Sequence, residues 1–146
     1  MIRRHPEPPA TVRSFTSAWG ELDYLCRKLH YWLYARKQKA GAERYLGRLE
    51  RVLKDLPEDD LAIVREDALA ILWELKGMTW KAIDHRRREI ALMEKLHKEA
   101  HSRKYSDSTR AYMLQGRDSR ALSERRQILG ALEKIQHESR TARKAP

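Results

Sequence analysis

Few residues in this chain have the types and spacing that metal binding or catalysis needs. His97 and His101 are four positions apart on a predicted helix, so both side chains could face one metal ion. Their sequence is HKEAH rather than HExxH, and His137 is the only distant residue that could join them. The sequence offers no phosphate-cradling glycine loop and no serine–histidine–aspartate arrangement. We therefore expect no catalytic residues, no metal site and no cofactor, and we do not expect an enzyme.

Basic side chains are the second group that could do chemistry, by binding phosphates or carboxylates. The net charge is +10, and Arg-Arg pairs recur at 86–87 and 125–126. If helical hairpins stack, these pairs repeat along one surface. The alternative is a set of solvated helix faces whose long stems cover apolar surface. The predicted basic surface comprises Arg44, Arg48, Arg51, Arg87 and Arg126.

Tyrosines accompany basic residues between positions 14 and 39. Tyr24, Tyr31 and Tyr34 lie near the apolar stripe of a predicted helix, among several lysines and arginines. Aromatic rings mixed with basic residues can stack on nucleobases, but the same spacing is typical of the edge of a packing face. Cys26, the single cysteine, lies on the apolar side of this helix and is predicted to be buried.

The elements that position these residues are all predicted to be helices. Apolar residues recur at helical spacing throughout, and no long segment alternates with the period of a strand. Helical hairpins are predicted at 14–56, 58–104 and 105–137. In the first of them, Gly41 is the expected break between helices over 14–39 and 42–56. Gly77 divides the central hairpin, because glycine enters the left-handed conformation after a helix without steric cost. Ser106 or Asp107 and then Asp118 are the expected N-caps further along.

The pattern of apolar and turn residues in the central hairpin repeats 39 residues later, so that Gly77 corresponds to Gly116. Trp73 and Ala82 are nine residues apart, as are Tyr112 and Ala121. A large aromatic residue nine positions before an alanine at a close helix contact resembles the tetratricopeptide repeat, over residues 62–136. The chain departs from that family in carrying arginine at the later aromatic position, in lacking the closing proline and in its longer period.

The resemblance implies six helices in three antiparallel hairpins, stacked as a right-handed array. A compact all-α bundle is the alternative. It also implies a concave groove lined by the first helix of each hairpin, which would bind a peptide or a partner helix. The groove residues carried over by register are Val64, Asp67, Ile71, Glu74, Arg103, Ser106, Arg110 and Met113.

Composition sets the remaining expectations. We predict a flexible basic arm at 1–13, one helical-repeat domain at 14–138 and a flexible basic tail at 139–146. Residues 58–78 carry two basic and six acidic side chains, an acidic strip in a basic protein. No segment is apolar enough to be a signal peptide or a membrane span, so we expect a cytoplasmic protein without a membrane partner.

The sequence supports two functions. The first is a non-enzymatic protein–protein interaction module, a scaffold or accessory subunit of a larger assembly, in which self-association is also open. The second is a basic helical subunit that binds nucleic acid through salt-sensitive backbone contacts.

Overall fold

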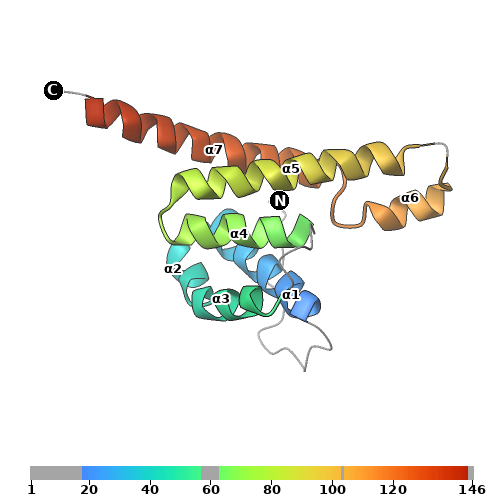
Figure 1. The fold of residues 1–146 in the computed structure, drawn as a ribbon, viewed down its shortest axis with the longest axis horizontal. Coiled ribbons are helices and arrows are strands. Elements are labelled where there is room, and N and C mark those ends of the chain that lie inside the picture. Colours follow the sequence, from blue (N-terminus) through green and yellow to red (C-terminus); the bar gives the residue numbers. More distant parts are fainter. Residues whose placement is uncertain (1–17, 57–62, 103, 145–146) are drawn as a thin grey trace, which may run out of the picture. The chain divides into compact units, whose positions relative to one another are not determined.

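The computed structural model of the chain describes residues 18–56, 63–102 and 104–144 (Figure 1). Every regular element in these ranges is helical, which confirms the predicted all-α class. The arm predicted at 1–13 lies outside the described residues. In chain order the elements are α1 (Ala18–His30), η1 (Tyr31–Ala35), α2 (Lys39–Glu43), α3 (Leu46–Lys54), α4 (Ile63–Leu75), α5 (Thr79–Ala100), α6 (Asp107–Met113) and α7 (Ser119–Lys144).

The helices cluster in two compact units, residues 1–78 and 79–146. The boundary falls just after Gly77, whose φ of +77° confirms the left-handed turn predicted there. Met78 N donates to Trp73 O at 2.9 Å, which closes that turn. The two arms of the predicted central hairpin therefore belong to different units.

The N-terminal unit departs from the predicted helix over 14–39 at its end. After α1 the backbone widens into the π-helix η1, in which Arg36 N donates to Tyr31 O at 2.8 Å. Lys37 then takes a φ of +53° and ends the helix. Gly41, which the sequence had suggested as the break, lies inside α2. The helix predicted over 42–56 is accordingly two pieces, α2 and α3.

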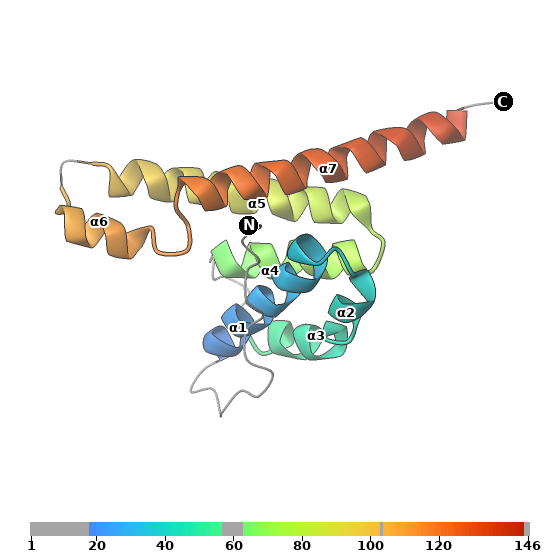
Figure 2. The same cartoon turned by 180° about the vertical axis from the view of Figure 1, so that it is seen from behind.

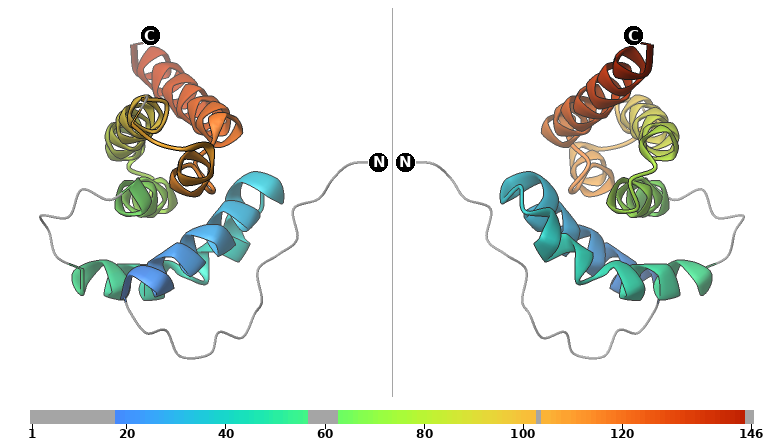
Figure 3. Two further views of the ribbon diagram at one scale, coloured as in Figure 1. Left: turned by 90° about the vertical axis from the view of Figure 1, so that its right-hand side faces the viewer. Right: turned by 90° about the vertical axis from the view of Figure 1, so that its left-hand side faces the viewer.

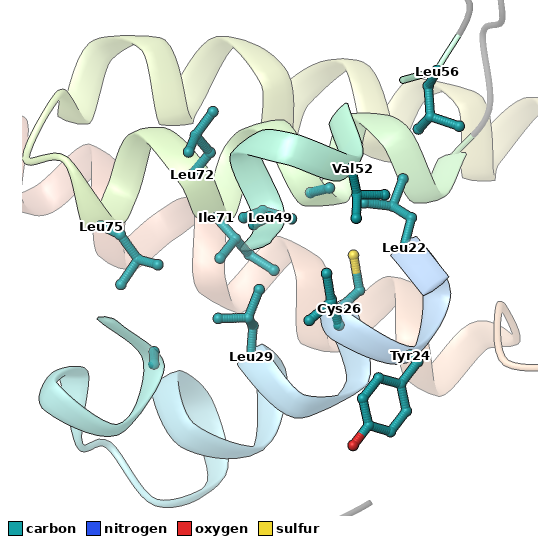
Figure 4. Packing of buried hydrophobic residues seen from close by; sticks show 13 residues of the cluster. Leu22, Tyr24, Cys26, Leu29, Leu49, Val52, Leu56, Ile71, Leu72 and Leu75 are labelled. Carbon is teal, nitrogen blue, oxygen red and sulfur yellow. The ribbon is translucent and has the colours of Figure 1, made fainter. Parts of the chain in front are cut away.

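The core of the N-terminal unit lies where α1, α3 and α4 meet (Figure 4). Apolar residues at helical spacing on these helices point inward and exclude water, which is the main favourable term in folding. Cys26 is buried among them, as predicted. The main members of this core are Leu22, Leu25, Cys26, Leu29, Leu49, Val52, Ala68, Ile71, Leu72 and Leu75.

The C-terminal unit consists of α5, α6 and α7, and its main contact is between the two long helices (Figure 2). These run antiparallel, because Arg87 of α5 meets Glu133 whereas Glu94, one heptad later, meets Arg126. Seen along the long axis, α7 crosses α5 at an angle (Figure 3). A stack of translated hairpins would instead place α5 and α7 parallel to each other.

Helix ends in the C-terminal unit follow the sequence signals. Ser106 accepts a bond from Thr109 N and caps α6, and Asp118 accepts one from Ala121 N and caps α7. Gly116 has a φ of +72° between them. However, α7 continues to Lys144, so most of the tail predicted at 139–146 is helical. The partner of α7 is α5 rather than α6, which corrects the third predicted hairpin.

Candidate functional site

The groove residues predicted on α4 make contacts inside the N-terminal unit. The side chain of Ile71 is 0% exposed and belongs to the core, and Asp67 is 4% exposed. Val64 is half-buried against the same core, and Glu74 accepts a hydrogen bond from Tyr34 Oη at 2.8 Å. These positions face α1 and η1, so they do not line an open groove on this unit.

A parallel series of contacts explains their orientation. Cys26 Sγ donates to Val64 O, His30 Nε2 lies 2.8 Å from both oxygens of Asp67, and Tyr34 bonds Glu74. The partners are 37 to 40 positions apart in each case, so α1 and η1 run parallel to α4. The acids of α4 thus balance polar groups of the first helix, because a buried carboxylate needs partners.

The His30–Asp67 pair was missed at the level of the sequence. Polar residues do interrupt the apolar sides of α1 and α4, at Lys28 and His30 and at Glu66 and Asp67, but the sequence does not show which of them pair. Such a pair resembles the base and its orienting acid in catalytic sites. Here, however, Nε2 faces the carboxylate and the ring packs on Tyr34, with centroids 4.9 Å apart. The arrangement ties two helices together.

The groove residues predicted in the C-terminal unit also make contacts within that unit. Arg110 donates from Nε to Ala100 O and from Nη1 to Asp107, both at 2.8 Å, and so fastens α6 to the end of α5. Met113 is half-buried, Ser106 is the cap of α6, and Arg103 lies outside the described residues. The polar contacts of Arg110 are therefore structural ones.

The residues of the predicted basic surface fall in both units: Arg44, Arg48 and Arg51 in the N-terminal unit, and Arg87 and Arg126 in the C-terminal unit. Arg87 and Arg126 each pair with a carboxylate across α5 and α7, and Arg48 pairs with Glu21. Arg51 is exposed on α3. Arg44 lies on the aromatic ring of Trp32, with its guanidinium carbon 5.0 Å from the ring centroid. Arg44 also lies over the ring of Tyr45, and Arg48 lies over that of Tyr24, with 5.9 Å from guanidinium carbon to ring centroid in each case.

A buried charge cluster lies between α5 and α7. Glu89 is 1% exposed and accepts from Arg86 Nη1 at 2.7 Å and from Arg125 Nε at 3.1 Å. Both arginines stand at the positions where the chain departs from the tetratricopeptide pattern. A carboxylate between two guanidiniums compensates the cost of removing these charges from water.

The predicted absence of a metal site concerns His97 and His101. His97 Nε2 donates to Arg117 O at 2.6 Å, which ties α5 to the segment before α7. Across the described ranges, no three His, Cys, Asp or Glu side chains gather as metal ligands would. Nor is any helix in these ranges long and apolar enough to cross a bilayer.

Four large hydrophobic side chains are exposed within the described ranges, and three of them belong to the C-terminal unit. Trp80, near the start of α5, is 56% exposed and has the Lys81 ammonium 5.4 Å from its ring centroid. Tyr112 and Ile135 are also exposed, and Met78 is the fourth. None of these residues was singled out as a site from the sequence.

Comparison of the chain with protein-family models, with curated proteins and with solved structures found no match.

Proposed function

We infer that the chain is a non-enzymatic interaction module, an accessory subunit that holds a protein partner against its C-terminal unit. The observation that carries this is the exposure of Trp80. Tryptophan is among the residues that most often anchor protein interfaces, and exposed apolar side chains of this size mark binding surfaces. The proposed surface therefore lies at the start of α5 rather than in the groove predicted on α4.

The residues around Trp80 indicate the chemistry of the partner. Seven-residue steps place Trp80 on the same side of α5 as Arg87 and Glu94. The same step places Arg140 on the side of α7 that carries Glu133. Arg87 and Glu133 face each other, so Trp80 and Arg140 lie on the same side of the helix pair.

Arg140 has no carboxylate partner within the described ranges. Residues 79–146 carry 17 basic and 9 acidic side chains, a net charge of +8. A helix or peptide that offers an apolar side chain to Trp80 and a carboxylate to Arg140 would complement this surface. An acidic amphipathic segment is the partner we propose.

Site-specific photocrosslinking tests the proposal. A photoreactive residue replacing Trp80 should form an adduct with the partner in cells. The matched control is Glu138, which is exposed on α7 but lies two residues before Arg140 and so on the opposite side of that helix. Equal adducts from both positions, or none from position 80, would refute this surface.

Binding to the purified partner gives a second readout. Trp80→Ala should weaken it by about 30-fold, the loss typical of an interface hot spot. Arg140→Glu should weaken it as well, and high salt should then have less effect on the affinity. Both positions are exposed, so the far-UV circular dichroism should be unchanged.

A further inference from the structure

A corner of the N-terminal unit combines several departures from regular structure. It comprises η1, the turn at 36–38, α2, Arg44 and Tyr45, and is called the Trp32 corner below. The π-helical turn is followed by a bond from Gln38 N to Trp32 O at 2.8 Å and by the left-handed Lys37. Wide helical turns and left-handed non-glycine residues are uncommon, and both are enriched at functional sites.

The indole of Trp32 is clamped at this corner. A Cβ on Gly41 would lie 2.2 Å from the ring, so only glycine fits against it. The guanidinium carbons of Arg44 and Arg36 lie 5.0 and 5.9 Å from the ring centroid, within cation–π range. The ring therefore holds two arginine side chains whose donors would otherwise sample many directions.

The cations of the Trp32 corner outnumber its acids. Arg36, Lys37, Lys39 and Arg44 are exposed, and none of them has an ion pair within the part of the chain that the structure describes. Glu43 is the only acid between positions 36 and 44. This differs from the C-terminal unit, where Arg87, Arg88, Arg110, Arg120 and Arg126 each meet an acid.

Aromatic rings complete the corner. Tyr31 meets Trp32 edge to face, with ring centroids 5.3 Å apart. The guanidinium carbon of Arg44 lies 5.9 Å from the ring centroid of Tyr45. Both tyrosines are only partly buried. Aromatic rings beside held guanidiniums are the combination that binds bases and phosphates of an unpaired strand, because a duplex hides its base faces.

We propose that the Trp32 corner binds single-stranded nucleic acid. Arg36 and Arg44 contact backbone phosphates, Lys37 and Lys39 add to the local positive potential, and Tyr31 or Tyr45 stacks on a base. This site goes beyond the protein-binding surface at Trp80 and does not depend on it.

Fluorescence anisotropy with the full chain and a labelled oligothymidylate of about 12 nucleotides tests the proposal. The double variant Arg36→Ala, Arg44→Ala should weaken binding by at least about tenfold. The slope of log K against log salt should become less steep by about 1.4, since two phosphate contacts to a single strand are lost.

The matched control is Arg51→Ala, Lys54→Ala. It removes the same charge from exposed positions of α3 in the same unit and should change affinity by less than about threefold. Equal losses in the two double variants would overturn the site, since they would show attraction to net charge alone. Lys37→Ala, Lys39→Ala gives an independent measurement if loss of the ring contacts unfolds the corner.

Competition with a DNA duplex and with polyglutamate shows which class of ligand the corner binds. A duplex of the same length should compete at least about tenfold more weakly than the single strand, because its bases cannot stack on the tyrosines. Polyglutamate of equal charge should also compete weakly, because it has neither bases nor tetrahedral phosphates. If polyglutamate competes as well as the oligonucleotide, the corner is a site for acidic protein and the nucleic-acid proposal is wrong.

Discussion

Arg87 of α5 donates from Nη2 to Glu133 of α7 at 3.0 Å. The residue 39 positions after Arg87 is Arg126, and the residue 39 positions before Glu133 is Glu94; these two are also bonded, at 3.0 Å. Equivalent residues of the repeat thus exchange partners, as they do across a two-fold interface. The repeat in the sequence corresponds, at these positions, to one antiparallel helix pair with local two-fold symmetry.

Reversing one of these ion pairs should show how weakly each contributes. Arg87→Glu alone places two acids face to face and should lower the free energy of unfolding by up to about 1 kcal/mol. Adding Glu133→Arg should restore most of the lost free energy of unfolding. The gain should shrink in high salt, because both side chains are about half exposed. Urea unfolding followed by circular dichroism measures the cycle; a double variant no more stable than Arg87→Glu would contradict the pairing.

Removing the buried carboxylate of Glu89 should lower the free energy of unfolding far more than breaking the Arg87–Glu133 pair. Glu89→Ala leaves Arg86 buried without its 2.7 Å partner, and loss of one member of a buried ion pair typically costs about 3–5 kcal/mol. Glu94→Ala is the matched control on the same helix, since that carboxylate is half exposed and should cost less than about 1 kcal/mol. The same unfolding measurement compares them, and similar losses would mean that the Glu89 cluster is solvated in solution.

The helices themselves were predictable because their signals are local. Ser106, Asp118, Gly77 and Gly116 act on backbone groups within a few residues, and each has the role that its type suggests. The break at Lys37 was not predictable, because lysine carries no preference for a left-handed conformation. Lys37 lies in the turn that the hydrogen bond from Gln38 N to Trp32 O closes.

The pairing of the helices depends on longer-range information. A 39-residue repeat fits a translated stack and an antiparallel pair equally well, because both bury the same stripes. The ion pair between Arg87 and Glu133 distinguishes them, and it is visible only once the register is known. Asp67 was assigned to a groove for the same reason: its partner His30 lies 37 positions away.

The phenol of Tyr105 offers a prediction about pH. Tyr105 donates to Glu99 Oε1 at 2.9 Å, and this hydrogen bond, with the negative charge of Glu99 and slight desolvation, raises the pKa of Tyr105 above its usual 10.0. The contact is therefore intact below pH 10 and is lost as the pH rises through the raised pKa. Spectrophotometric titration, with Tyr105→Phe to assign the signal, should show a lower pKa in Glu99→Gln. An unchanged titration would contradict the bond.

Two glycines of the N-terminal unit should respond to alanine in opposite ways. Gly41→Ala drives a methyl group to 2.2 Å from Trp32 and should destabilise the protein by about 1–3 kcal/mol, the usual cost of overpacking. Gly47→Ala meets nothing within 4 Å on α3 and should stabilise it by up to about 1 kcal/mol, because alanine has less backbone freedom to lose. Thermal unfolding of each variant checks the signs. In a Trp32→Leu background the cost of Gly41→Ala should fall sharply, because the ring that the methyl group meets is gone; an unchanged cost would show that backbone strain, not contact with the indole, is what requires glycine there.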